Sequence, residues 1–440
     1  MYIQIGTATD IVMYTTVRNI GFSPSVDLTC DSLPIDELTV DVVTTDTITS
    51  GQRVELYDAL DALWARFWLY KVEQIGPGLL RLYARSDVAL LDDVTLDAVM
   101  YSGDSAADVF DATMIVSSGH GTGIVEVLDY DLDPAIASMT VTGYCPQQTA
   151  RERLQWLCMA LGAVVKGSFV ERLTIEPLDA TATIVPLEDT YARPGVTLSE
   201  IVTEVRVTSY TLTPGTPTTT EQYVTDGNGD TYIVTSQKLQ LVNPAATPED
   251  PDNVVEIDGM YLINSTNASA ILSRLADRHF KRTQISLNCV NNRTYKPGDR
   301  VTVYTDRHTM AAGYIEQASF AFGTQAKAAL ALAAVEDVET AALTISYTWQ
   351  GMTLAIETHT LPVGYAYSVT TRYLDQRING HRYIFRPTVA EVTGTLTSEG
   401  AAATVLCEVA LDLYKGILHI ISVDSATLDP TASENVVVIA

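Results

Sequence analysis

Short segments in which apolar and polar residues alternate constrain this chain more than any other feature of its sequence. In residues 37–42, a leucine and two valines alternate with a glutamate, a threonine and an aspartate. A period of two places the apolar side chains on one face of a strand and the polar ones on the other. About one residue in eight is threonine, and β-branched residues favour strands. The segment predicts a strand with one wet, acidic face, and the chain should be mostly β.

Similar patterns recur between Gly, Pro and Asp residues, which predicts further strands joined by turns. They cover residues 53–57, 67–72, 79–84, 202–212, 301–305 and 311–322. This spacing is typical of sandwiches and barrels.

Three segments instead carry apolar residues at intervals of three and four, which predicts helices. The first spans residues 147–165, with Thr149 as its cap, and the second spans residues 267–282, capped by one of residues 265–267. A shorter helix is expected over residues 105–114.

The length of 440 residues predicts about three domains. Pro-rich stretches at residues 213–218 and 243–251 bracket a predicted hairpin, residues 222–241, whose tip is residues 226–230. Acidic residues at 336–339 follow a well-patterned strand, and strand signals then restart at Leu343, so a domain boundary is expected there.

Charge limits the partners of this chain. It carries 27 Lys and Arg against 54 Asp and Glu, a net charge of −27. Such a surface repels phosphate, so tight binding of nucleic acid is not expected. Two readings of this charge stay open: an acidic, soluble surface, or a wall past which a polyanion slides without sticking.

The N-terminal residues show no secretory signal, and no apolar run is long enough to cross a bilayer, so we expect a soluble chain made in a cytoplasm. The cysteines are scattered and form no C-x-x-C pair, which argues against a disulfide framework or a zinc site and predicts buried thiols. They are Cys30, Cys145, Cys158, Cys289 and Cys407.

Candidate motifs for chemistry are weak. Asp226, Asn228 and Asp230 have the spacing that opens a calcium loop, but Thr231 and Gln237 stand where such a loop needs Gly and Glu, so a hairpin turn is favoured. The Gly-rich residues 118–123 lack the Lys-Ser/Thr of a phosphate-binding loop. The histidines have no metal-ligand spacing, and no nucleophile motif occurs. We therefore expect no catalytic residue, metal or cofactor, and no enzyme.

Residues 381–387 are locally basic and aromatic, a combination that can stack on a sugar or a base. A plain alternating strand is the favoured interpretation. Arg382, Tyr383 and Arg386 are nevertheless the best ligand-binding candidates in the C-terminal domain.

The order of elements over residues 1–335 resembles the baseplate hub proteins of tailed bacteriophages, which are related to the hub and spike proteins of contractile injection systems. No single motif is decisive, and the order carries the resemblance. The segments concerned are Gly51–Tyr57, Trp68–Val72, Ser105–Phe110, Val141–Pro146, Ala150–Leu154, Leu161–Val165, Ile263–Ala268, Lys281–Arg282, Lys296–Val303 and Gly313–Glu316.

The resemblance implies two tube-forming, β-barrel-like domains with an α/β insertion, assembled as a homotrimer with pseudo-sixfold symmetry. The expected domains are residues 1–100, completed by a strand near 196–212, the insertion 101–195, and 196–335 with a hairpin excursion at 213–252. Residues 336–440 are expected to add a C-terminal β-sandwich.

The implied role is structural: a ring in the virion's tail baseplate that connects the hexameric tube to the tail tip. The implied partners are tail-tube and distal tail proteins, other baseplate subunits, and a spike, tip or tape-measure protein. DNA would pass without binding, kept mobile by acidic strand faces such as that of Glu37 and Asp41. A receptor- or carbohydrate-binding tail-tip protein is the alternative, and a tail-associated cell-wall hydrolase is the third possibility.

Overall fold

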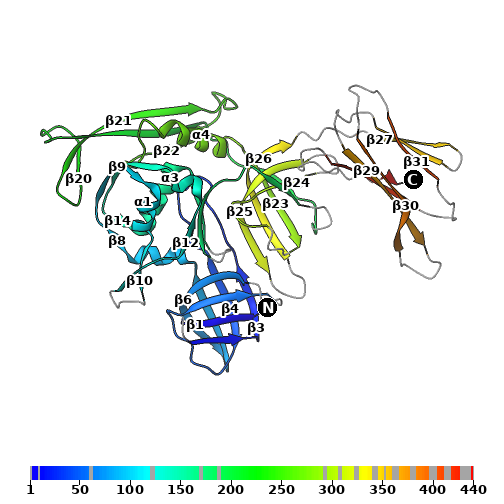
Figure 1. The fold of residues 1–440 in the computed structure, drawn as a ribbon, viewed down its shortest axis with the longest axis horizontal. Coiled ribbons are helices and arrows are strands. Elements are labelled where there is room, and N and C mark those ends of the chain that lie inside the picture. Colours follow the sequence, from blue (N-terminus) through cyan, green and yellow to red (C-terminus); the bar gives the residue numbers. More distant parts are fainter. Residues whose placement is uncertain are drawn as a thin grey trace. The chain divides into compact units, whose positions relative to one another are not determined.

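The fold was analysed in a computed structural model of the 440-residue chain (Figure 1). It falls into two units, residues 1–302 with 312–336, and residues 303–311 with 337–440. The structure describes residues 2–7, 10–58, 63–118, 124–167, 172–185, 190–290, 295–305, 310–321, 327–338, 345–350, 353–358, 366–376, 383–395, 404–410, 418–426 and 438–439.

A 13-stranded sheet dominates the first unit, and the chain is mostly β, as predicted. Its first half has the strand order β3-β4-β7-β6-β5-β1-β2, and every pair is antiparallel. These strands are β1 (Tyr2–Thr7), β2 (Asp10–Tyr14), β3 (Val17–Phe22), β4 (Glu37–Val43), β5 (Arg53–Tyr57), β6 (Leu63–Gly76) and β7 (Leu79–Arg85).

The second half of the same sheet has the order β18-β23-β26-β25, and β24 and β17 continue from β25. Its strands are β17 (Ala182–Ile184), β18 (Gly195–Leu198), β23 (Thr283–Val290), β24 (Arg300–Tyr304), β25 (Met310–Ala321) and β26 (Lys327–Val338). The segment 196–212, expected to complete the first barrel, contributes β18, which pairs with β23, and β19 (Glu204–Pro214), which lies in a separate sheet.

The two halves meet edge to edge. Phe320 and Ala321 of β25 pair with Phe22 and Gly21 of β3. The rings of Phe22 and Phe320 stack with centroids 5.7 Å apart, and Ser23 donates a hydrogen bond to Ser319 over 3.2 Å. One sheet therefore runs through both halves, with a shared apolar face.

Between the halves, the described residues form short sheets, one 3-10 helix and three α-helices, from η1 (Asp87–Asp93) to β16 (Leu173–Pro177). The elements between are β8 (Thr95–Leu96), β9 (Val99–Ser105), α1 (Ala106–Thr113), β10 (Ile115–Ser118), β11 (Ile124–Val127), β12 (Tyr130–Leu132), α2 (Pro134–Ala137), β13 (Thr140–Cys145), β14 (Gln148–Thr149), α3 (Ala150–Leu161) and β15 (Ala163–Lys166).

The first predicted helix is confirmed at its start and is shorter at its end. Thr149 and Glu152 form a reciprocal capping box, which fixes the start of α3. Gly162 ends the helix with φ of 78°, a conformation that glycine adopts without a steric penalty. The residues after Gly162 therefore form β15 rather than a last helical turn.

The predicted hairpin is present and belongs to a four-stranded sheet of order β20-β21-β19-β22. Asp226 builds the tip, since its Oδ1 accepts hydrogen bonds from the backbone N–H groups of Asn228 and Asp230. The second predicted helix, α4 (Ala268–His279), packs against β19 and β21 (Figure 1). The other strands are β20 (Tyr223–Thr225), β21 (Thr231–Val242) and β22 (Val254–Ile257).

The second unit contains two antiparallel sheets, β27-β28-β31 and β30-β29-β32-β33. Whether they stack as the expected sandwich stays a prediction. The strands are β27 (Ile345–Gln350), β28 (Thr353–Thr358), β29 (Ala366–Gln376), β30 (Tyr383–Thr395), β31 (Thr404–Ala410), β32 (Leu418–Ala426) and β33 (Val438–Ile439).

Candidate functional surface

The polar face of the first half-sheet carries an ordered set of charged and aromatic side chains. Strand alternation builds it, because the side chains on the opposite face, such as Leu38, Val54 and Leu82, are fully buried. We call this face the charge lattice. It consists of Glu37 and Asp41 on β4, Arg81, Tyr83 and Arg85 on β7, Arg66, Trp68, Tyr70, Lys71 and Glu73 on β6, and Arg53, Glu55 and Tyr57 on β5.

Asp41 is buried and paired, so the prediction of a wet, acidic face on β4 is wrong at this residue. Its carboxylate accepts two hydrogen bonds from Arg81, over 2.7 and 2.9 Å, and one from Asn19 Nδ2 over 2.7 Å. The hydrogen bonds from Arg81 lower the pKa of Asp41 below its ordinary value. Only 2% of the Asp41 side chain is exposed.

Glu37 is exposed, as predicted, but it too faces a cation. Arg85 Nε donates a hydrogen bond to its carboxylate over 3.2 Å. The guanidinium of Arg85 also lies 4.1 Å from the centre of the Tyr70 ring. The two carboxylates of β4 therefore pair with arginines on the neighbouring strand β7 and do not form an unpaired acidic row.

The other cations of the charge lattice are occupied in the same way. Arg66 binds Glu55 over 3.0 Å, and Lys71 binds Glu73 over 3.3 Å. Lys71 lies 4.7 Å from the centre of the Tyr83 ring. Arg53, on the neighbouring strand, has its guanidinium 5.4 Å from the centre of the Trp68 ring. Opposite charges interleave across the strands, which neutralises the face locally.

The same face of the sheet changes character in the second half. Nine exposed side chains there carry neither a charge nor an aromatic ring, and Gly195, Ser286 and Ala331 form one row across three strands. We call this the uncharged face. It consists of Gly195 and Thr197 on β18, Gln284, Ser286 and Asn288 on β23, Ala329 and Ala331 on β26, and Gln317 and Ser319 on β25.

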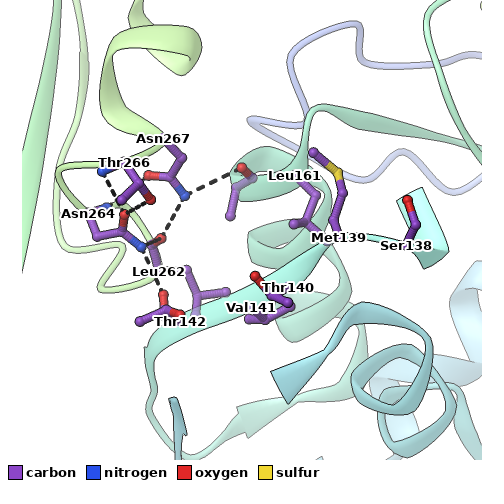
Figure 2. A pocket seen from close by; sticks show the side chains of 11 residues that line it. Ser138, Met139, Thr140, Val141, Thr142, Leu161, Leu262, Asn264, Thr266 and Asn267 are labelled. Carbon is purple, nitrogen blue, oxygen red and sulfur yellow. Dashed lines mark hydrogen bonds between the residues drawn. The ribbon is translucent and has the colours of Figure 1, made fainter. Parts of the chain in front are cut away.

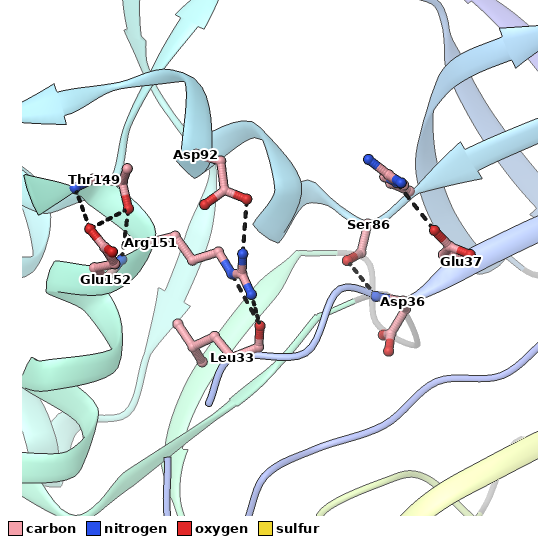
Figure 3. A network of polar contacts seen from close by, with 9 residues as sticks. Leu33, Asp36, Glu37, Ser86, Asp92, Thr149, Arg151 and Glu152 are labelled. Atoms are coloured by element: carbon pink, nitrogen blue, oxygen red, sulfur yellow. Dashed lines mark hydrogen bonds and ion pairs between the residues drawn. The ribbon is translucent and has the colours of Figure 1, made fainter. Parts of the chain in front are cut away.

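A set of polar contacts, which we call the polar joint, fixes the elements from η1 to β16, here called the middle elements, to the first half-sheet (Figure 3). The guanidinium of Arg151 on α3 donates to the Leu33 carbonyl over 2.7 and 3.1 Å and binds Asp92 over 2.9 Å. Nearby, the Asp36 N–H donates to Ser86 Oγ over 3.1 Å. The joint holds the loop between β3 and β4, and it offers no free nucleophile.

A groove of about 410 Å³ lies between β13, the end of α3 and the loop before α4 (Figure 2). Its amides are used to hold that loop: Asn264 Nδ2 donates to the Thr142 carbonyl over 3.0 Å, and Asn267 Nδ2 donates to the Leu262 carbonyl over 3.0 Å. Asn264 Oδ1 also accepts from the Thr266 backbone. The described residues that line the groove carry no titratable side chain.

The sequence-predicted ligand candidates lie in the second unit. Arg382 is outside the described residues. Tyr383 and Arg386 lie on β30, where they pair in register with Gln376 and Tyr373 of β29. Ligand binding by this segment stays a prediction. In the Gly-rich loop, residues 119–123 are likewise outside the described residues.

The described residues show neither a metal-holding cluster nor a membrane-spanning helix. These contain no group of three or more His, Cys, Asp or Glu side chains placed to hold a metal ion. They also contain no helix that is long and apolar enough to span a membrane. Cys30, Cys145, Cys158 and Cys289 are buried, as predicted.

The comparisons give a fold likeness and no sequence family. No protein-family model and no curated protein matches the chain. The fold is similar to that of the tail protein from Neisseria meningitidis MC58, with a TM-score of 0.50 and 13% identity over 76% of this chain and 96% of that chain.

Two further tail proteins show weaker similarity. The prophage tail protein gp18 from Listeria monocytogenes EGD-e gives a TM-score of 0.47 at 12% identity, over 76% of this chain and 94% of that chain. The 43 kDa tail protein of prophage MuSo2 from Shewanella oneidensis gives 0.48 at 10% identity, over 75% and 96%. The chain thus shares its fold with the Neisseria tail protein, in line with the tail-protein resemblance of its element order.

Proposed function

We propose that this chain is a structural protein of a phage tail and acts as its baseplate hub, a ring of three copies that joins the tail tube to the tail tip. The observation that carries this proposal is the fold likeness to the Neisseria tail protein, which spans 96% of that protein. The proposed partners are the tail tube, the distal tail proteins, the other baseplate subunits and a spike, tip or tape-measure protein.

The two half-sheets of each chain support a ring in which the number of similar β-rich halves is twice the number of copies. Each chain supplies two β-rich halves that meet edge to edge at β3 and β25. Three copies would then present six such halves around an axis, which would match a hexameric tube.

The polar face of the sheet has the chemistry expected of a channel wall for DNA. Duplex DNA gains affinity when Lys and Arg displace its counterions, and bases stack on exposed aromatic rings. The uncharged face offers neither group. On the charge lattice, Arg66, Lys71, Arg81 and Arg85 are already bound to carboxylates. DNA would stay mobile because most cations are missing or occupied, and not because β4 presents an acidic row. Arg18 on β3, opposite Asp41, is the exception: it is exposed and has no ion pair among the described residues.

Single-particle electron microscopy of tail particles containing the chain tests the hub role. We expect three copies in a ring on the tail axis, stacked on a sixfold tube, with the polar face of the 13-stranded sheet toward the channel. A peripheral position with no axial channel would overturn the proposal and favour a host-surface role for the second unit.

A further inference from the structure

Along its main path, the 13-stranded sheet ends in two strands that each have one unpaired edge, while a branch through β24 ends in β17. β2 pairs only with β1, and β18 pairs only with β23, among the described residues. Each outer edge therefore presents backbone N–H and C=O groups without a strand partner. Such an edge is a template for adding another strand.

The edge strand β2 lacks the features that usually protect such an edge. Its three central side chains are apolar and exposed: Ile11 by 56%, Val12 by 41% and Met13 by 52%. The strand contains no Lys, Arg or Pro, and its pairing with β1 has no bulge. Lysine, proline and bulges are the common means of blocking edge pairing.

The opposite edge, β18, leaves the apolar face of the sheet unfinished. Val196 lies opposite the buried Ile285 and so shares its face, as does Leu198 two residues later. Val196 is 50% exposed and Leu198 is 67% exposed. An added strand would cover these side chains and continue the core.

Further copies of this chain can satisfy both edges, with one neighbouring copy at each edge. A symmetric dimer through β2 would leave β18 open, whereas head-to-tail pairing uses one edge from each copy and can repeat until the assembly closes. The chain already joins two half-sheets in this manner, where β25 meets β3. Val12 and Tyr14, which lie on the apolar face opposite Ile5 and Ile3, would meet Val196 and Leu198 across the new pair.

We infer that β2 of one copy pairs with β18 of the next, so that the sheet continues from copy to copy. Closure after three copies rests on the proposed hub function, while the strand pairing itself does not.

Crosslinking between copies tests the pairing. Cys407→Ala is placed in every full-length variant, and the four described native thiols are buried. Val12→Cys and Val196→Cys variants are then mixed at high concentration and treated with a short bismaleimide, which tolerates a one-residue shift in register. We expect a crosslinked dimer in the mixture and not with either variant alone. A Val12→Cys product alone would mean symmetric pairing and would overturn the inference, as would no product in the mixture.

A second measurement uses charge to block the edges. Ile11→Lys and Leu198→Lys each replace an exposed edge side chain, so folding should survive and association should not. The matched control is Met139→Lys, which alters an apolar side chain of similar exposure in the middle elements. In sedimentation experiments, we expect at least a tenfold loss of association for the edge variants and none for the control. Unchanged association of both edge variants would contradict the pairing.

These results separate the inference from the proposed function. If the crosslink forms but particles hold the chain away from the tail axis, the pairing stands and the hub role fails. If particles show an axial ring in which β2 and β18 do not meet, the hub role stands and the pairing fails.

Discussion

At Asp41, burial and charge oppose each other, and the surrounding residues decide the outcome. A buried carboxylate is costly unless it is paired and hydrogen-bonded. Arg81 and Asn19 supply three hydrogen bonds, and the pKa of Asp41 is lowered as a result. The residue therefore anchors β3, β4 and β7 to one another.

We expect Asp41→Asn to lower the free energy of unfolding by about 1–3 kcal/mol at neutral pH, because it removes a charge-assisted, bidentate pair. Urea denaturation followed by tryptophan fluorescence, to which Trp64 and Trp68 near this site contribute, measures this change. Glu37→Gln is the control: its side chain is 58% exposed, so its effect should stay within about 0.5 kcal/mol.

The pH dependence of this difference has a defined sign. Because the folded-state pKa of Asp41 is below its ordinary value of about 3.9, its contribution is complete above that value and is lost as pH falls through the folded pKa. The stability gap between wild type and Asp41→Asn should shrink below about pH 4. A gap that stays constant down to pH 2 would contradict this assignment.

Gly162 combines a left-handed backbone with close contact. A Cβ there would lie 2.7 Å from Arg274 Nη1, and Arg274 is half-buried and donates a hydrogen bond to the Met159 carbonyl. Gly103 has a similar φ of 87° but has no atom within 4 Å of its would-be Cβ. We expect Gly103→Ala to cost about 1 kcal/mol, from backbone strain alone, and Gly162→Ala to cost at least twice that. Equal losses in thermal denaturation would exclude the contact as a cause.

At the scale of elements, the start of α3 shows a local signal that the sequence carries in full. Thr149→Ala should destabilise the protein by about 1 kcal/mol, because it removes the cap from the N–H of Glu152. Ser105 precedes α1 without a side-chain cap bond, so Ser105→Ala should change stability by less than about 0.5 kcal/mol. Chemical denaturation of the two variants compares them directly, and equal losses would rule out the capping box as the cause.

Strand positions were predictable, whereas strand partners were not. Residues 53–57 form β5 with the predicted bounds, because alternation is a local property. The pairing of β3 with β25 joins residues about 300 positions apart, and no local pattern encodes it. For the same reason, no local pattern showed that β18 would pair with β23.

At the scale of the whole molecule, the proposed channel wall predicts an effect of added positive charge. Ser286 and Asn288 are exposed on the uncharged face, so lysines there should leave folding intact. We expect tails carrying Ser286→Lys and Asn288→Lys to release DNA more slowly, and more so at low salt, because each lysine adds a phosphate contact. Met139→Lys is the control. Release at the wild-type rate at all salt concentrations would exclude this face as the wall.

The sequence by itself determined the β-rich fold class, the positions of several strands such as β4, β5 and β7, the start of α3, the hairpin tip at Asp226 and the resemblance to phage tail proteins. These follow from side-chain period, caps and turn residues, which act over a few positions. The tertiary structure decided the meaning of the charges. From the sequence, Glu37 and Asp41 predict an acidic face. In the structure, Arg85 and Arg81, more than 35 residues away on the neighbouring strand β7, pair with these two carboxylates. Net charge is a sum over the chain, but the field at a surface depends on which charges the fold brings together.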